Sequence, residues 1–245
     1  MKKLAKIAKI TVNKHFQRYK ASYYYHFLLA SLILMTTVSL FISNNKFLIT
    51  LFDFSYLSVL IVSAAAAFKS IGRTVWLLVL LFSMTIFFRI LQVITGLPAF
   101  EKLYHILVMV ILFMTFVIIM YSVMKSKRID SNIISGAICG YLIMGIICAS
   151  IYMIAESTCP GSFRFTTLAP GHLSPSELAD EFYYYSMITL TSVGFGDTIP
   201  VSRLMKHITI LEAVSGQIYL TIIIARLVGI QISQRDNKQK EENSQ

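Results

Sequence analysis

The sequence predicts an all-α membrane protein with six transmembrane helices and one further segment that enters the membrane without crossing it. Hydrophobic residues make up 56% of the 245 positions and charged residues only 14%. A soluble domain carries about 25% charged residues and could not bury this much apolar surface. Six apolar stretches are long enough to cross a bilayer core of about 30 Å. A more polar, glycine-containing segment separates the last two stretches.

The six stretches alternate with short polar breaks. They cover His26–Ser43, Lys46–Phe68, Val75–Gly96, Leu103–Met124, Ser131–Ala155 and Met205–Ile232. The Asn44-Asn45 break is so short that the first two helices must form an antiparallel hairpin, and Pro98 marks a helix stop after the third. The predicted parts of the chain are a basic segment (1–25), a four-helix domain (26–128), a two-helix unit with its intervening segment (129–232) and a short tail (233–245).

The net charge of +10 is explained by how basic residues are distributed over the loops. With alternating spans, fifteen Lys and Arg residues lie on the side of the N-terminus and five on the other side. Basic residues accumulate on the cytoplasmic side of membrane proteins. We therefore predict a multi-pass protein of the cell membrane (the inner membrane in a bacterium) with both termini cytoplasmic. Membrane lipids are its expected surroundings, and nucleic-acid binding has no support.

The basic N-terminal segment precedes the first apolar stretch. Its apolar residues recur at roughly helical spacing among the lysines, which predicts a helix lying on the inner leaflet; a disordered basic tail is the alternative. A cleaved signal peptide is disfavoured because the basic lead is some 25 residues long. No small-residue cleavage site follows the first apolar run.

The segment between the fifth and sixth stretches, residues 156–202, is too polar at both ends to span. Ser174 can cap a helix, Pro175 suits its first turn, and Glu177 completes a capping box. The predicted helix runs to residue 190 or 191 and ends in a Ser-Val-Gly-Phe-Gly strand, in which two glycines free the backbone. A short helix and such a strand between two spans predict a re-entrant loop, which is tolerated where it is covered by protein or lines a water-filled cavity.

This strand carries the string Thr191-Ser192-Val193-Gly194-Phe195-Gly196-Asp197. It resembles the selectivity-filter signature of potassium channels, T-x-G-Y/F-G-D, and the resemblance covers about Ser131–Ile232. The resemblance implies passive conduction of K⁺, with K⁺ as the permeant ion and no cofactor or small-molecule substrate. One string per chain cannot enclose a pore, so four chains around one axis, a homotetrameric channel, are expected.

The resemblance also implies roles for the residues of the string. The carbonyls of Ser192, Val193, Gly194 and Phe195 would bind K⁺, with the Ser192 hydroxyl at the innermost site, and Gly194 and Gly196 would permit the backbone. Ser192 stands where the family usually has Thr and so lacks a methyl that restricts the rotamer. Phe195 replaces the usual Tyr and lacks its bracing hydroxyl. We predict a functional but less rigid filter; a weakly selective cation channel or a regulatory channel subunit is the alternative.

Other residues are expected to support this filter. They are Thr189, Thr191, Asp197, Tyr185 and Glu212, the last through hydrogen bonds to hydroxyls such as those of Ser186 or Thr189. The three tyrosines 183–185 would form an aromatic cuff around the filter, or else an interfacial belt. Carboxylates at the outer mouth would concentrate cations there; these are Glu177, Asp180, Glu181 and Asp197.

The sixth stretch is the predicted inner helix. Gly216 falls twenty residues after Gly196, where similar potassium channels carry a gating hinge. Glycine costs about 1 kcal/mol in a helix, so bending is cheapest there; close packing against a neighbour is the alternative. Helical spacing groups the expected gate and cavity residues, which are Gly216, Gln217, Leu220, Ile224 and Val228. Gly136, Gly140 and Gly145 in the fifth stretch are expected to permit close helix packing.

Ionisable residues within spans are rare and are expected to find partners. Asp53 and Arg89 lie at similar depths in the second and third spans and are predicted to form an ion pair. The fourth span carries no Lys or Arg, so the six-span layout lacks voltage-sensor charges.

An enzyme is disfavoured by the full sequence. It contains neither Gly-x-Ser-x-Gly nor His-Glu-x-x-His, and its five histidines are scattered without metal-ligand spacing. No catalytic residue is therefore assigned. Cys139 and Cys148 are expected to pack as small apolar residues, and Cys159 to be a free thiol.

Overall fold

The computed structural model describes residues 24–39, 72–95, 97–126, 128–166 and 175–242. It has helices α2 (Tyr24–Ser39), α4 (Gly72–Thr95), α5 (Pro98–Lys125), α6 (Ser131–Thr158), α7 (Pro175–Leu190) and α8 (Arg203–Glu242), and strands β1 (Phe163–Phe165) and β2 (Thr198–Pro200). Five of the six predicted spans correspond to helices. The second predicted span, Lys46–Phe68, lies outside the described residues, as do residues 1–23 of the predicted basic segment 1–25.

Three helical stretches in the described part of the chain are long and apolar enough to cross a membrane. They are Lys102–Lys125, Ser131–Thr158 and Arg203–Asp236. Two further apolar stretches, Tyr25–Leu34 and Leu80–Leu91, are shorter. The mostly helical, membrane-type fold is therefore confirmed, whereas six complete spans stay a prediction.

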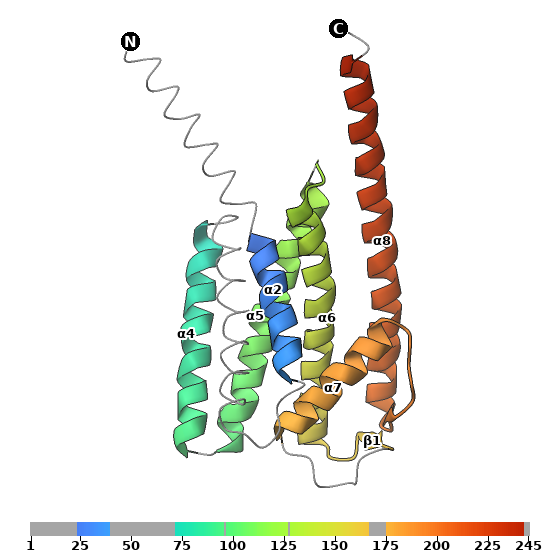
Figure 1. Cartoon of the computed structure of the whole chain (residues 1–245). Coiled ribbons are helices and arrows are strands. Elements are labelled where there is room, and N and C mark those ends of the chain that lie inside the picture. The colour runs from blue at the N-terminus through green and yellow to red at the C-terminus, as the bar shows by residue number, and fades with distance from the viewer. Residues whose placement is uncertain (1–23, 40–71, 96, 127, 167–174, 243–245) are drawn as a thin grey trace, which may run out of the picture.

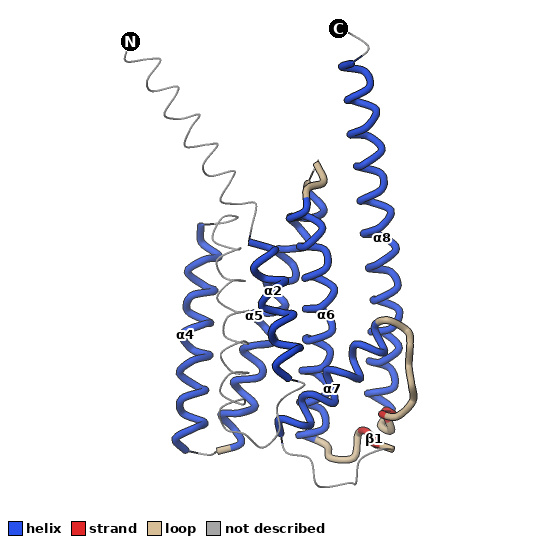
Figure 2. The backbone as a smooth tube through the Cα atoms, viewed as in Figure 1, coloured by secondary structure: helices blue, strands red, loops and turns tan. Residues whose placement is uncertain are grey.

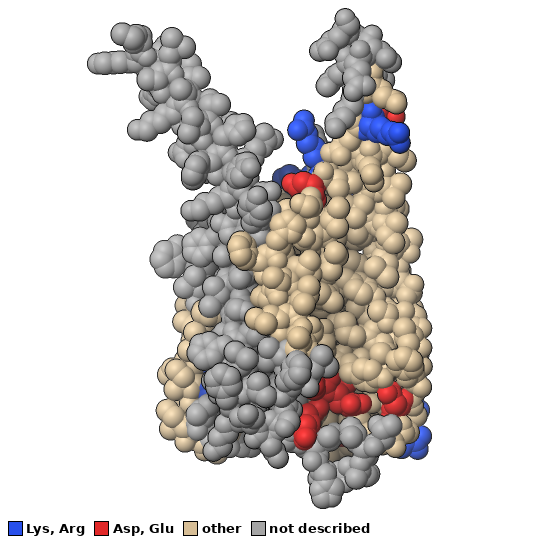
Figure 3. Space-filling view, viewed as in Figure 1, with Lys and Arg blue, Asp and Glu red and all other residues tan. Residues whose placement is uncertain are grey.

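The long helices stand side by side and form the body of the molecule (Figure 1). Helix α4 packs on α5, α5 on α6, and both α2 and α8 on α6. The N-terminal end of α2, the turn between α5 and α6 and the C-terminal end of α8 share one end of the molecule, while β1 marks the other (Figure 1). On the face shown in Figure 3, most charged side chains gather toward these two ends.

Local sequence explains where several helices begin and end. Pro98 starts α5, where the missing N–H costs nothing. Asp130 caps α6 by accepting a 2.9 Å hydrogen bond from the Ile133 N–H. Helix α8 continues ten residues past the predicted end at Ile232, because residues 233–242 contain no glycine or proline and many good helix formers. The predicted separate tail is thus largely an extension of α8.

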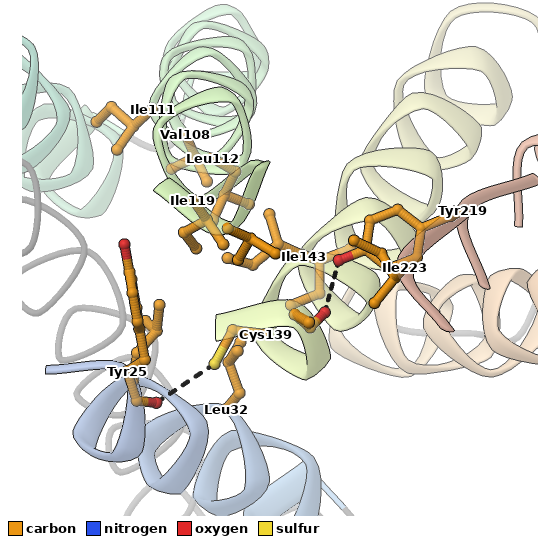
Figure 4. Close-up of a cluster of buried hydrophobic side chains, with 14 of the residues drawn as sticks. Tyr25, Leu32, Val108, Ile111, Leu112, Ile119, Cys139, Ile143, Tyr219 and Ile223 are labelled. Atoms are coloured by element: carbon orange, nitrogen blue, oxygen red, sulfur yellow. Dashed lines mark hydrogen bonds between the residues drawn. The ribbon is translucent and has the colours of Figure 1, made fainter. Parts of the chain in front are cut away.

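The main core lies where α2, α5 and α8 meet α6 (Figure 4). Small residues on α6 allow this approach. A Cβ at Gly136 would lie 2.9 Å from the Tyr25 ring, and one at Gly140 would lie 2.6 Å from the Tyr219 hydroxyl. Because Gly140 has no side chain, the Tyr219 hydroxyl can approach α6, where it donates to the Ala137 carbonyl at 2.6 Å. The predicted packing role of these glycines is confirmed.

Candidate functional site

Helix α7 and the loop after it form a segment that enters the helix bundle and returns to the same end (Figure 2). Helix α7 begins at Pro175 and ends at Leu190, as predicted; Ser174, its predicted cap, lies outside the described residues. The loop of residues 191–197 leads back to β2, which pairs antiparallel with β1 so that Phe163 lies opposite Pro200. This is the shape of the predicted re-entrant segment.

A buried aromatic cluster fixes α7 against α6 and β1. The Phe163 and Phe182 rings meet edge to face with centroids 4.9 Å apart, and Tyr152 lies 5.2 Å from Phe163 and 5.3 Å from Tyr185. All four side chains are at least 96% buried. Edge-to-face contacts add specific geometry to the apolar burial. Tyr152 and Phe182 were not predicted to support the site, because their contacts come from different elements.

Glu212 of α8 joins three helices at one buried point. Its side chain is only 3% exposed. The Tyr152 hydroxyl of α6 donates to Glu212 Oε2 at 2.5 Å, and the Ser186 hydroxyl of α7 donates to Glu212 Oε1. A buried carboxyl group needs such partners. The expected bond to Ser186 is thus present, and it comes with Tyr152, a second donor that the sequence did not indicate.

The C-terminus of α7 is closed by a Schellman motif. The Val193 N–H donates to the Ile188 carbonyl at 2.8 Å and the Ser192 N–H to the Thr189 carbonyl at 2.9 Å. Ser192 therefore takes the left-handed position that glycine usually fills, with φ of 60°. A non-glycine residue there costs roughly 1–2 kcal/mol, which these two hydrogen bonds offset. The motif explains why the string starts with an unusual backbone.

Left-handed residues alternate along the string. Ser192 has φ of 60°, Gly194 of 53° and Gly196 of 79°, while Val193 and Phe195 between them keep negative φ. This alternation departs from an ordinary strand, in which every residue has negative φ. The string is open to its surroundings in the single chain: Val193 is 54% and Phe195 70% exposed.

The loop is held at its outer end through Asp197. The Tyr184 hydroxyl donates to Asp197 Oδ2 at 2.6 Å, and the Thr166 N–H donates to the Asp197 carbonyl at 2.8 Å. The hydrogen bond from Tyr184 lowers the pKa of Asp197 and raises the pKa of Tyr184 to about 12. Tyr185 points elsewhere, because it is buried and its hydroxyl lies 2.9 Å from that of Thr209 on α8. Acidic side chains gather beside α7 at this end (Figure 3).

The inner helix α8 crosses directly beside the end of α7. Gly216 is buried there, and a Cβ at this position would overlap the Leu190 carbonyl oxygen. The next residue, Gln217, donates from Nε2 to Ser192 Oγ at 2.9 Å. Close packing, the alternative interpretation of Gly216, is what the structure shows; bending at this glycine stays a prediction.

The comparison with protein families concerns this same part of the chain. A family model described as "Ion channel" matches residues 138–232. This region is thus similar to an ion channel domain. No curated protein and no solved structure matches the chain. The matched region takes in most of α6, all of α7, the string and α8 as far as Ile232, so the contacts described above in this section lie within it.

The other predicted pore residues differ in exposure. Ile224 and Val228 are 58% and 48% exposed, on the same face of α8 as Gln217. Leu220 is half-buried and packs against the main core. Thr189 is buried, and the Thr191 hydroxyl donates to the Met187 carbonyl of its own helix at 2.7 Å.

Arg226, which was not among the predicted residues, joins α8 to the end of α5. Its Nε donates to the Val123 carbonyl at 3.4 Å, and its Nη2 donates to the carbonyls of Met124 and Ser126, the latter at 3.2 Å. The last carbonyls of a helix lack partners within the helix and attract cations. Arg226 thus caps α5 from α8, an arrangement that spacing along one helix does not reveal.

The predicted ion pair in the first four helices is only half described. Asp53 lies outside the described residues, so its pairing with Arg89 stays a prediction. The Arg89 guanidinium lies over the Tyr104 ring of α5, with 5.4 Å between Cζ and the ring centroid. This cation–π contact joins α4 to α5.

Proposed function

We propose that the protein is a potassium-selective ion channel, in which four copies of the chain surround one pore and conduct K⁺ passively across the cell membrane. The string Ser192–Gly196 is the selectivity filter. The observation that carries the proposal is its backbone, in which residues of positive φ alternate with residues of negative φ between two apolar helices. Carbonyls turned to one side can replace the hydration shell of a cation. The match of residues 138–232 to an ion channel family supports ion conduction by this part of the chain.

The exposure of the string supports assembly around an axis. Irregular backbone at membrane depth is tolerated only where protein covers it or it lines a water-filled cavity. In one chain neither condition is met, because Val193 and Phe195 are mostly exposed. Helix α8 also exposes a stripe of large apolar side chains, which are Ile210, Val214, Ile218 and Ile222. Neighbouring copies would cover both features, and a closed ring is the usual symmetric solution.

Charge around the string favours cations. The string directly follows the C-terminal end of α7, which is the negative end of the helix dipole. At the opposite end, Asp197 is kept ionised by Tyr184. Fourfold repetition of these features would raise the local cation concentration. Both termini are proposed to be cytoplasmic, which places Asp197 at the extracellular mouth.

A second candidate is a weakly selective cation channel or a regulatory subunit of the same architecture. It is favoured by Ser192 and Phe195, which stand where the filter signature usually has Thr and Tyr. Either change leaves the carbonyls in place but removes a side-chain constraint. Ion selectivity therefore distinguishes the two candidates.

Flux into liposomes that contain the purified full-length protein tests the proposal. We expect K⁺ flux that exceeds Na⁺ flux manyfold and is blocked by Ba²⁺. Gly194→Ala should abolish the flux, because alanine is strained at φ of 53°. Gly161→Ala is the matched control, since Gly161 also has positive φ, at 86°, but lies outside the string. Equal K⁺ and Na⁺ flux would favour the second candidate, and flux unchanged by Gly194→Ala would overturn both.

A further inference from the structure

We propose that Gln217 is the positioning residue for the innermost ion site, because its side-chain amide fixes the Ser192 hydroxyl in the orientation that presents its oxygen to K⁺. This inference rests on the proposed function. It assigns to one residue of α8 a specific task in ion coordination, distinct from lining the cavity.

The backbone explains why position 192 holds a serine. Ser192 is the left-handed residue of the Schellman motif that ends α7, with φ of 60°. A β-branched residue at positive φ is a strong outlier, so threonine would be strained there. Serine fits, but it lacks the second Cβ substituent that restricts χ1 in threonine. The hydroxyl at the start of the string therefore needs an external constraint.

Gln217 supplies this constraint. Its Nε2 donates to Ser192 Oγ at 2.9 Å. A serine oxygen has two acceptor sites and one hydrogen to donate. With one acceptor site held by Gln217, the other can face a cation while the hydroxyl hydrogen turns away.

The position of Gln217 is itself fixed by the close approach at the preceding residue. Gly216 lies so close to Leu190 that no side chain fits between them, which sets the height of α8 against the end of α7. One turn further along α8, the Thr221 hydroxyl donates to the Gln217 carbonyl at 2.8 Å. Thr221 lies on the same exposed face of α8, but its hydroxyl is hydrogen-bonded within its own helix. It therefore offers a matched control for a polar side chain on the same face.

A double-mutant cycle on the tetrameric full-length channel tests the assignment. The variants are Gln217→Met, which keeps the length but not the donor, Ser192→Ala, the two combined, and Thr221→Val as control. The readout is the Ba²⁺ concentration that halves K⁺ flux, because Ba²⁺ binds the same oxygen ligands with twice the charge of K⁺. We expect Gln217→Met to raise this concentration about fivefold to tenfold, the effect of one lost neutral hydrogen bond. Thr221→Val should leave it unchanged.

The combined variant shows whether Gln217 positions the Ser192 hydroxyl or acts on the ion directly. If Gln217 acts through Ser192, Gln217→Met should add nothing once Ser192 is alanine. The inference would be overturned if Gln217→Met raised the half-blocking Ba²⁺ concentration by the same factor with Ser192 and with alanine at this position, or if it did not change this concentration at all. Either result would leave the proposed function intact. If Gln217→Met does not assemble, Gln217→Asn can replace it, because it keeps the amide but is one methylene shorter. It should weaken the block by Ba²⁺ to the same extent. An unsubstituted chain without K⁺ flux would overturn the proposed function and this inference together.

Discussion

At the scale of single residues, a few polar side chains determine how the string is held. Ser192 receives a hydrogen bond from Gln217 at the inner end, and Asp197 receives one from Tyr184 at the outer end. Glu212 joins the three helices behind them. Each contact links residues of different helices or loops. The string is therefore positioned by side chains from both α7 and α8.

The Tyr184–Asp197 contact predicts a pH dependence of conduction. Because the hydrogen bond lowers the pKa of Asp197, the mouth keeps this charge as pH falls and loses it only below the ordinary carboxyl pKa of about 3.9. In Tyr184→Phe the charge should be lost at the ordinary value, that is, at a higher pH. Single-channel K⁺ current measured while the external pH is lowered should show this upward shift of the midpoint.

The neighbouring tyrosine provides the control for this prediction. Tyr183 is half-buried and packs against both core clusters, so Tyr183→Phe should keep the wild-type midpoint. Identical midpoints in wild type and Tyr184→Phe would contradict a role for the hydrogen bond in ionising Asp197.

At the scale of elements, two contacts of α8 set its position. Near its middle, Gly216 lies against the end of α7. Ten residues further, Arg226 donates to the last carbonyls of α5. Helix α8 is thus held at two levels, by the end of α7 and by the end of α5.

The first of these contacts predicts different effects for two glycines of the same helix. Gly216→Ala should destabilise the protein by about 1–3 kcal/mol, because the methyl group overlaps a backbone oxygen that cannot rotate away. Gly229→Ala should be neutral or stabilising by up to about 1 kcal/mol, since nothing lies within 4 Å of a Cβ there. Thermal unfolding of both variants in mild detergent measures the difference. Equal stability would show that α8 does not need this close approach.

The second contact predicts that Arg226 stabilises the junction of α5 and α8. Arg226→Gln should cost about 1–2 kcal/mol, because charge-assisted hydrogen bonds to helix carbonyls are lost. Arg235→Gln, at an exposed position on the same helix, is the control and should have little effect. Thermal unfolding, together with hydrogen exchange in the last turn of α5, measures the loss. If both substitutions had a similarly small effect on stability, Arg226 would not stabilise the junction of α5 and α8.

At the scale of the whole molecule, one chain leaves its most unusual segment uncovered. The string and one stripe of α8 are exposed. Helix α6, by contrast, has a side that is buried under α2 and α5. This asymmetry predicts that the covered side faces the first helices and the open side faces other copies of the chain.

Mixing wild-type and Gly194→Ala chains tests the number of copies. In a tetramer with one shared filter, a single altered chain should block the pore. Equal expression of both chains should then leave about one-sixteenth of the wild-type current, against about a quarter for a dimer. Electrical recording from co-expressing cells measures this fraction. Half of the current would indicate that each chain conducts independently.

The sequence by itself determined the class of protein, five of the described helices and the extent of the re-entrant segment. These follow from local chemistry: apolar runs of sufficient length, Pro175 at a helix start, and a glycine pattern that few other structures require. The string Thr191–Asp197 could also be recognised from the sequence as resembling a filter signature, since all of its residues are contiguous. Even the expected partner of Glu212 on α7 came from counting positions along two helices.

Only the tertiary structure decided how the string is held. The left-handed turn at Ser192 arises from hydrogen bonds to carbonyls three and five residues earlier, which no composition pattern specifies. Gly216 against Leu190, Gln217 on Ser192 and Arg226 on the end of α5 join residues between 25 and 103 positions apart. Such contacts depend on the relative height and rotation of packed helices. Those quantities are set by the sum of many side-chain contacts and not by any local segment.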